Sequence, residues 1–208
     1  LARIESSLQQ QKQFTSDASH EIRNPLSAIR GTLEVLIRKQ RDPGLYEEKI
    51  ADVISQVDRL DTLLDQLLHL ARIESGIIYV KKETIYLSML INTLKERWAE
   101  TADLNQISIH ANVNNLAIVT VDKLFLELML DNLLSNAIKY GRENGNVFLS
   151  WDEATRTLSV KDDGQGISEN DLPNIFNRFY RVDESRSSAI KGNGLGLSIV
   201  KELAGIQH

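Results

Sequence analysis

Two long stripes of apolar residues, separated by a short break, limit what the first 75 residues can fold into. In each stripe the apolar residues follow one another in alternating steps of three and four, which is typical of a helix in a coiled coil or bundle. The first stripe is Ile22, Leu26, Ile29, Leu33 and Leu36. The second is Ile50, Val53, Val57, Leu60, Leu64, Leu67 and Ala71. Between them, residues 41–44 contain Pro43 and Gly44, which oppose a continuous helix, so the pattern predicts a helical hairpin.

Two helices alone bury little apolar surface, so such a hairpin needs a further partner. A homodimer, in which two hairpins form a four-helix bundle, is the interpretation we favour. A plain coiled-coil spacer is the alternative, and the stripes alone leave it open.

The pattern changes after Ser75 and Gly76, where short alternating segments begin to mix with helical ones. Strands are expected at residues 84–87, 107–110, 116–121, 147–151 and 157–160, and helices at residues 88–102, 122–140 and 195–203. Pure helix followed by a mixture places a domain boundary near residues 74–82. We assign residues 1–75 to the hairpin and residues 76–208 to an α/β domain.

The composition excludes several classes of protein. The chain has 24 lysine and arginine residues against 29 aspartate and glutamate, a net charge of −5, which argues against a nucleic-acid-binding surface. It has no cysteine, so disulfides and thiolate metal sites are excluded. No apolar stretch approaches the roughly 18 residues of a membrane-spanning helix, so no membrane segment is expected in this fragment, which should be soluble.

Two glycine clusters give the first indication of a ligand. Asp162-Asp163-Gly164-Gln165-Gly166-Ile167 follows a predicted strand, and Gly192-Asn193-Gly194-Leu195-Gly196-Leu197-Ser198 precedes a predicted helix. Glycines before a helix let backbone N–H groups approach a phosphate, and the helix dipole favours negative charge there. Neither cluster is a P-loop or a dinucleotide-binding fingerprint. Each alone is typical of a tight turn, but together they indicate a nucleotide bound by another route.

The predicted helix at residues 122–140 carries amide and ammonium groups on one face. Asn132, Asn136 and Lys139 share that face through their i, i+4 and i+7 spacing. Amide oxygens suit Mg²⁺, and an ammonium group suits a phosphate. A solvated polar face is the alternative interpretation.

His20 lies in the first helix, nine residues before Ile29 of the first stripe. That separation is about 900° of helix, so His20 should face away from the stripe. Glu21 follows directly and Asn24 lies one turn further on. Pro25 cannot donate to the carbonyl of Glu21, so the helix should bend there. A lone helical histidine is usually a surface or packing residue.

Taken in order, these segments resemble the five motif boxes of the sensor histidine kinases. They are the H box (residues 14–26, Phe14 to Leu26), the N box (Asn132 to Asn136), the G1 box (Asp162-x-Gly164-x-Gly166), the F box (Phe176-Asn177-Arg178-Phe179-Tyr180-Arg181) and the G2 box (Gly192-x-Gly194-x-Gly196). The resemblance covers nearly the whole chain. It implies an all-α hairpin that dimerises into a four-helix bundle, followed by an α/β sandwich of the Bergerat type that gyrase and mismatch-repair ATPases share.

In the hairpin, the resemblance implies that His20 is the phosphoacceptor and that Glu21 acts as its general base. Asn24 would position the water that hydrolyses the phosphorylated partner. The implied reaction is transfer from ATP to His20 and then to an aspartate of a response-regulator receiver domain.

In the α/β domain, the resemblance implies that ATP is bound with Mg²⁺. Asp162 would accept a hydrogen bond from the adenine amino group, Asn136 would hold Mg²⁺, and Arg178 and Arg181 would stabilise the transferring group. The other implied contacts are Asn132, Lys139, Tyr140, Gly164, Gly166, Ile167, Phe179, Gly192, Gly194, Leu195, Gly196 and Leu197. Residues 176–181 and 182–191 would form a lid over the phosphates, and residues 183–190 of it should be mobile.

The chain departs from the family at its end, because family members continue with two more strands and a further glycine box. We therefore expect an α/β domain without its last strands, in a fragment of a longer protein. The resemblance implies that the whole protein is anchored in the bacterial cell membrane with this part on its cytoplasmic side.

Two other functions stay open. The first is a dimeric signalling scaffold that binds ATP without transferring phosphate. The second is an ATP hydrolase, which Asn132 disfavours, because related hydrolases have a glutamate there and an amide cannot take a proton from water.

Overall fold

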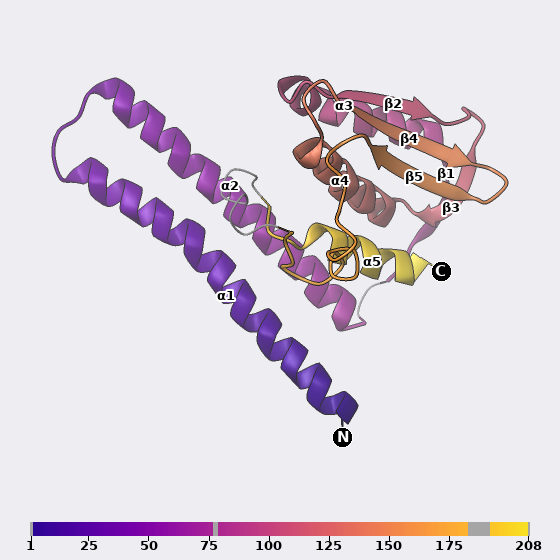
Figure 1. Ribbon diagram of the computed structural model, residues 1–208, viewed down its shortest axis with the longest axis horizontal. Helices are drawn as coiled ribbons and strands as arrows, with labels where there is room; N and C mark the ends of the chain where they lie inside the picture. Colours follow the sequence, from indigo (N-terminus) through magenta and orange to yellow (C-terminus); the bar gives the residue numbers. More distant parts are fainter. Residues whose placement is uncertain (1, 77–78, 183–191, 208) are drawn as a thin grey trace. The chain divides into compact units, whose positions relative to one another are not determined.

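The computed structural model describes residues 2–76, 79–182 and 192–207. The chain divides into two compact units, Leu1–Glu74 and Ser75–His208. The first unit consists of two long helices, α1 (Ala2–Ile37) and α2 (Pro43–Glu74), which run antiparallel (Figure 1). The predicted helical hairpin is therefore confirmed. Within the described part of the chain, no helix has the length and hydropathy needed to cross a membrane.

The break between the two helices lies slightly earlier than the sequence pattern predicted. It comprises residues 38–42, whereas Pro43 and Gly44 belong to the first turn of α2. Proline suits the first position of a helix, because the N–H it lacks would have no partner there. Asp42 caps this turn: its Oδ1 accepts from the Gly44 N–H at 2.9 Å, and its carbonyl accepts from the Leu45 N–H at 3.0 Å.

Pro25 lies inside α1, and the helix continues on both sides of it. The helix lacks only the hydrogen bond that an N–H at position 25 would donate to the Glu21 carbonyl. The expected bend at this position stays a prediction.

In the single hairpin, each apolar stripe contains both exposed and covered residues. Alternate members stay exposed: Leu26 (48%), Leu33 (43%), Ile50 (48%), Val57 (49%) and Leu64 (41%). The other members, apart from Ala71, are at least partly covered. One partner helix covers only one edge of a stripe with alternating steps, so the other edge faces outward. Leu63 and Leu70 are buried although they lie outside the predicted stripe.

Within the described residues, the second unit contains two small sheets and three helices, and it confirms every predicted strand and helix to within a few residues. Its elements are β1 (Lys82–Tyr86), α3 (Leu87–Leu104), β2 (Ser108–Asn112), β3 (Ile118–Asp122), α4 (Lys123–Tyr140), β4 (Asn146–Asp152), β5 (Thr157–Asp162) and α5 (Gly196–Gln207). β1 pairs antiparallel with β3. In the larger sheet β4 is central, parallel to β2 and antiparallel to β5.

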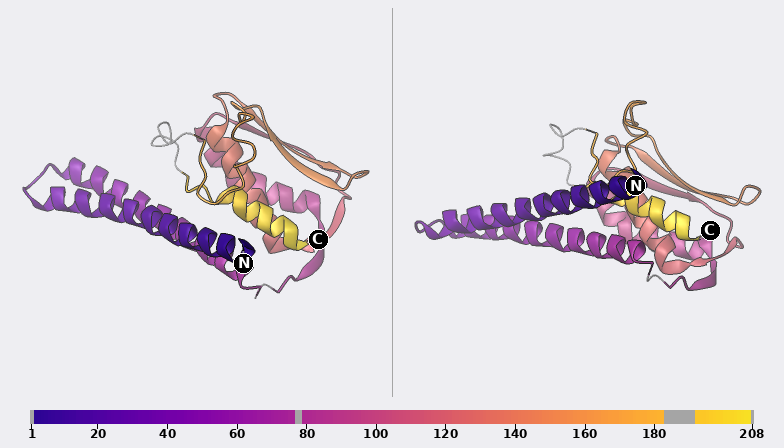
Figure 2. Two further views of the ribbon diagram at one scale, coloured as in Figure 1. Left: turned by 60° about the horizontal axis from the view of Figure 1, so that its bottom comes forward. Right: turned by 90° about the horizontal axis from the view of Figure 1, so that it is seen from below.

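The helices of the second unit lie on one face of the larger sheet (Figure 2). The core forms between this face and the apolar sides of α3 and α4. Its fully buried members include Leu87, Ile91 and Leu94 of α3, Leu130 and Leu134 of α4, and Val147 and Leu149 of β4. On α4 this burial leaves the opposite side, which bears Asn132 and Asn136, at the edge of the core.

Asp122 fixes where α4 begins. Its Oδ1 accepts from the Phe125 N–H at 3.1 Å and its Oδ2 accepts from the Lys81 N–H at 2.7 Å. Its own N–H donates to the Gln207 side chain at 3.0 Å, near the end of α5. A buried carboxylate with these donors caps the helix and ties α5 to its start.

Candidate functional site

His20 is exposed on α1, as its separation from the apolar stripe predicted. Glu21 is half-buried beside it, and its Oε2 lies 3.9 Å from the Arg59 Nη2 of α2. Asn24 is exposed one turn along. The hairpin therefore presents an imidazole, a carboxylate and an amide within two helical turns.

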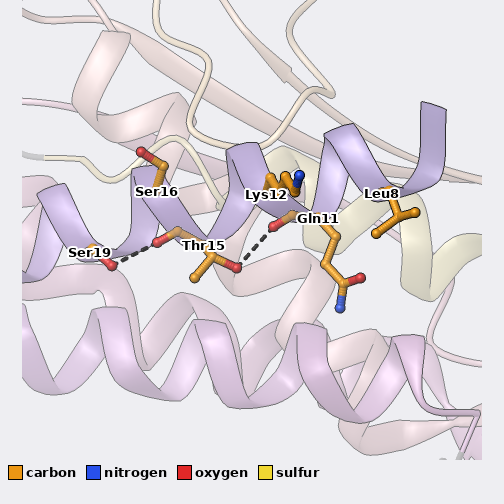
Figure 3. A pocket seen from close by; sticks show the side chains of 6 residues that line it. All are labelled: Leu8, Gln11, Lys12, Thr15, Ser16 and Ser19. Carbon is orange, nitrogen blue, oxygen red and sulfur yellow. Dashed lines mark hydrogen bonds between the residues drawn. The ribbon is translucent and has the colours of Figure 1, made fainter. Parts of the chain in front are cut away.

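A shallow groove of about 430 Å³ runs along α1 before His20 (Figure 3). Two of its hydroxyls are already used inside the helix: Thr15 donates to the Gln11 carbonyl at 2.9 Å, and Ser19 donates to the Thr15 carbonyl at 2.8 Å. These two hydroxyl groups are therefore not available as donors to a ligand. Its lining residues are Leu8, Gln11, Lys12, Thr15, Ser16 and Ser19.

The two asparagines of the N box lie on the half-buried side of α4. Leu134, Ala137 and Ile138 are buried, while Asn132 and Asn136 are half-buried and Lys139 is exposed. The Asn132 Nδ2 donates to the Leu128 carbonyl at 2.8 Å. A Cβ built on Gly196 of the G2 box would lie 2.7 Å from the Asn132 Oδ1. The N and G2 boxes therefore touch, and a side chain at Gly196 would require the Asn132 amide to move.

The G1 box lies at the end of β5, next to the end of α4. The Asp162 Oδ1 accepts from the Gly164 N–H at 2.9 Å, which makes a tight Asx turn. A side chain on Gly164 would collide with the Tyr140 carbonyl and approach the Gly141 backbone. Gly166 has a φ of +71°, which disfavours any other residue. Ile167, the next residue, is exposed.

A cavity of about 390 Å³ opens between the end of α4 and the G1 box. The cationic groups of Lys139 and Arg142 and the backbone of two glycines line it. This combination suits a ligand that has several negative charges and a flat ring. Its lining residues are Lys139, Tyr140, Gly141, Arg142, Asp163, Gly164 and Gln165.

Asp163, which the sequence did not single out, fixes the wall of this cavity through three hydrogen bonds. Its carboxylate accepts from the Asn146 N–H at 2.8 Å, from the Asn146 Nδ2 at 3.0 Å and from the Arg142 Nη2 at 2.9 Å. These bonds lower its pKa to about 2, the Asn146 bonds first and the arginine second. In the sequence, Asp163 is simply an acidic residue beside the glycines of the G1 box. Its partners Asn146 and Arg142 lie 17 and 21 residues earlier, so its structural role appears only in the folded chain.

The F and G2 boxes meet through their backbones. The Phe179 N–H donates to the Gly194 carbonyl at 2.9 Å. Both residues adopt left-handed backbone, with φ of +60° and +68°. A Cβ on Gly194 would lie 2.6 Å from the Phe179 carbonyl carbon. The two boxes are therefore in contact without room for a side chain at Gly194.

The remaining predicted residues lie around this contact. Leu195 is fully buried and Leu197 is half-buried at the start of α5. A Cβ built on Gly192 would lie 4.0 Å from the Tyr140 hydroxyl, an ordinary contact distance. The Arg178 Nη2 lies 4.0 Å from the Glu202 Oε1 of α5, and Arg181 is half-buried. Of the predicted lid, residues 183–191 lie outside the described residues.

Comparison with known proteins places both units in one kind of protein. Residues 10–76 match the His Kinase A (phospho-acceptor) domain. Residues 121–208 match the histidine kinase-, DNA gyrase B-, and HSP90-like ATPase family. The chain is 32% identical over 205 residues to the sensor histidine kinase WalK of Bacillus subtilis and 34% identical over 206 residues to the signal transduction histidine-protein kinase ArlS of Staphylococcus aureus. The chain belongs to the histidine kinases.

The matches to these relatives include 94% and 98% of this histidine kinase chain, but only 33% of WalK and 46% of ArlS. The chain thus spans a third to a half of the relatives' length. The Acinetobacter baumannii histidine kinase AdeS shares its fold, with a TM-score of 0.70, 23% identity and coverage of 88% of this chain and 85% of that chain. Full-length ShkA, solved with AMPPNP, has a TM-score of 0.66 at 26% identity, covering 93% of this chain and 40% of that chain.

The histidine kinase fold brings four of the five predicted boxes together. The N, G1, F and G2 boxes all belong to the second unit, where α4 touches both glycine boxes. The H box belongs to the first unit. Sequence reasoning missed Asp163 and also Asp171, which binds Tyr180 of the F box. For Asp171 a local signal exists, the spacing Ser168-x-x-Asp171, which is typical of a side chain that caps a turn.

Proposed function

We propose that this chain is the kinase core of a sensor histidine kinase that transfers the γ-phosphoryl group of ATP to His20. One observation carries the proposal: three glycine-rich or asparagine-rich segments, far apart in sequence, meet around α4. Gly164 is packed against the Tyr140 carbonyl, and Gly196 against the Asn132 amide. If each glycine cluster were only a local tight turn, there would be no physical reason for both clusters to contact α4.

The residues of this site fit ATP. The cavity beside the G1 box is lined by Lys139 and Arg142, which attract phosphate oxygens, and by Tyr140, whose ring can contact a base. The Gly164 N–H engages Oδ1 of Asp162, which leaves Oδ2 to accept from an adenine amino group. The start of α5 at Gly196 adds N–H groups and a favourable dipole for phosphate.

Mg²⁺ would be held by the Asn136 amide oxygen together with phosphate oxygens of the nucleotide. Within the described residues, no group of three or more histidine, cysteine, aspartate or glutamate side chains is placed to hold a metal. An amide oxygen and water with phosphates are ligands that Mg²⁺ accepts. The metal would therefore enter with ATP, where it neutralises phosphate charge.

At His20, a ring nitrogen would attack the γ-phosphorus, so that a P–N bond forms while the bond to the β–γ bridging oxygen breaks and ADP leaves. Glu21, the next residue, would take the proton from the ring. Arg178 and Arg181 of the F box would stabilise the charge on the transferring group. Arg59, near Glu21 on α2, would keep that carboxylate in place.

Asn132 favours transfer over hydrolysis. It stands where related hydrolases have a glutamate, and its Nδ2 is already bound to the Leu128 carbonyl. A neutral amide cannot accept a proton from attacking water. The site should therefore hold ATP until His20 reaches it.

A homodimer would cover the exposed edge of the two apolar stripes. Leu26 and Leu33 of α1 and Ile50, Val57 and Leu64 of α2 each leave two-fifths or more of their surface exposed in the single hairpin. A second hairpin completing a four-helix bundle would bury this strip. The exposed strip on both helices supports the dimer, because the single hairpin leaves it without a partner.

The phosphoryl group on His20 would pass to an aspartate of a response-regulator receiver domain. The related structure of ThkA was solved in complex with the response regulator protein TrrA. Asn24, one turn after His20, would orient the water that removes phosphate from that regulator, so the kinase would also act as a phosphatase. We also propose that the full-length protein is anchored in the membrane, with this part on the cytoplasmic side.

Incubation with γ-labelled ATP tests the kinase proposal. Wild type should gain acid-labile, base-stable label, and His20→Gln should gain none while its ATP affinity stays within about twofold, because the nucleotide residues belong to the other unit. His69→Gln, on α2 of the same hairpin, is the matched control and should keep its label. Bound ATP without label would indicate the signalling scaffold, and free phosphate without label would indicate the hydrolase.

A further inference from the structure

The segment directly after the G1 box folds into a chain of tight turns. The carbonyl of Ser168 accepts from the N–H groups of Asp171 and Leu172, each at 3.1 Å. The Asn174 N–H then donates to the Asp171 carbonyl at 2.8 Å, and the Asn177 N–H donates to the Asn174 carbonyl at 2.8 Å. These turns lead from the G1 box into the F box.

Asp171 joins the two ends of this segment with its side chain. Its Oδ2 accepts from the Ser168 hydroxyl at 2.6 Å, close to the end of the G1 box. Its Oδ1 accepts from the Tyr180 hydroxyl at 2.7 Å, inside the F box. Hydrogen bonds to a charged carboxylate are shorter and stronger than neutral ones, and both of these distances are short.

The protonation states keep this arrangement intact at neutral pH. The Ser168 and Tyr180 hydroxyls lower the pKa of Asp171, so the carboxylate stays charged. The same carboxylate raises the pKa of Tyr180, so the phenol stays a donor. Asp171 and Tyr180 are both half-buried, which limits competition from water.

Tyr180 follows the strained residue of the F box. Phe179 has a φ of +60°, which is unfavourable for a side chain of this size. Its N–H is held by the Gly194 carbonyl at 2.9 Å. A strained residue persists only where its surroundings hold it in place, and here Gly194 holds one side and Asp171, through Tyr180, the other.

These contacts form a continuous connection among all four boxes of the ATP unit. Asp171 links the end of the G1 box to the F box, Phe179 links the F box to Gly194 of the G2 box, and Gly196 touches Asn132 of the N box. Asp171 itself lies outside all four boxes.

We propose that Asp171 is a positioning residue for phosphoryl transfer, which holds the F box in register with the G1 and G2 boxes through Tyr180. The inference rests on the proposed kinase function. Asp171 touches neither of the reacting groups. It sets where Arg181, the residue after Tyr180, meets the phosphates. Small displacements of groups that contact a transition state lower the rate far more than they lower ground-state binding.

The test uses the full-length kinase and measures the initial rate of labelling from γ-labelled ATP over a range of ATP concentrations, with the ADP affinity and thermal unfolding midpoint of each variant. Tyr180→Phe and Asp171→Ala should each lower the maximal rate by between about 10-fold and 100-fold. Their ADP affinities should stay within about twofold of wild type. The double variant should be no slower than the slower single one, because both changes remove the same hydrogen bond.

A conservative variant separates positioning from general stability. Asp171→Asn keeps an oxygen that accepts from the Tyr180 hydroxyl, so its maximal rate should recover to within about fivefold of wild type. Asn170→Ala, at the exposed neighbouring position, and Tyr86→Phe, at the end of β1, are the matched controls and should label at the wild-type rate.

Three outcomes are distinguishable. Equal, parallel losses of ADP affinity, unfolding midpoint and rate in Asp171→Ala, with no recovery in Asp171→Asn, would overturn the positioning role. Wild-type rates in Tyr180→Phe would overturn it as well. Absence of label in wild type and in both controls would instead refute the kinase function on which the inference rests.

Discussion

The contact between Gly194 and Phe179 gives a prediction whose magnitude can be worked from the structure. In Gly194→Ala the new Cβ would lie 2.6 Å from the Phe179 carbonyl carbon and 2.8 Å from its Cα, and both are backbone atoms that cannot rotate away. The φ of +68° adds a second cost, which any residue with a Cβ must bear. Left-handed backbone costs about 1–2 kcal/mol and overpacking about 1–3 kcal/mol, which together give about 2–5 kcal/mol.

This cost should appear mainly as lost ATP affinity. The segment can relieve the collision by moving the G2 box away from the F box, and ATP would then have to restore the contact when it binds. A cost of about 2 kcal/mol corresponds to roughly 25-fold weaker binding, which is the smallest effect expected. Calorimetric titration with Mg-ATP, in the full-length kinase, measures it.

Two further glycines of the same unit separate the cost of left-handed backbone from the cost of overpacking. Gly166 has a φ of +71° but open space around its Cβ position, so Gly166→Ala should cost only about 1 kcal/mol, or roughly fivefold in affinity. Gly205 lies in α5 with nothing near it, and Gly205→Ala should leave ATP affinity unchanged and stabilise the helix by about 0.5–1 kcal/mol. If Gly194→Ala binds ATP as well as Gly166→Ala does, the close F–G2 contact is not required and the reasoning is refuted.

Three other predictions concern single side chains. Asn136→Ala should weaken Mg-ATP binding and stop labelling, because it removes the proposed Mg²⁺ ligand; a titration with unchanged Mg-ATP affinity would count against this role. The folded-state pKa of Asp163 is lowered to about 2 from an ordinary 3.8, so this group stabilises the fold above about pH 4 and the contribution is lost as the pH falls toward 2. Asp163→Asn should therefore lower the free energy of unfolding at pH 6, with the difference from wild type shrinking as denaturation is followed down to about pH 2.5; a difference that does not depend on pH would contradict the assigned cause. Asn24→Ala should keep autophosphorylation and lose most phosphatase activity toward the phosphorylated regulator, and equal loss of both activities would indicate a structural role beside Pro25.

The sequence pattern alone determined the order of elements and the family. Apolar residues spaced by alternating steps of three and four lie on one side of a helix, where a neighbouring helix can cover them. The hairpin could therefore be predicted from the pattern between Ile22 and Ala71 without tertiary information. The five boxes are short runs whose residue types and order survive in the linear sequence. The glycines of both boxes were likewise visible, because tight turns depend on neighbouring residues.

The tertiary structure decided which side of each apolar stripe is covered and which polar groups meet. Leu26 and Ile29 are equivalent members of one stripe in the sequence, yet the folded hairpin leaves Leu26 exposed and partly covers Ile29. Asp171 is one of many acidic residues in the chain until the turns after the G1 box bring Tyr180 to within 2.7 Å of it. A hydrogen bond between side chains depends on the positions of atoms from two segments, and a linear pattern fixes only the residues within one segment. The contacts that align the four boxes therefore arise only when the chain has folded.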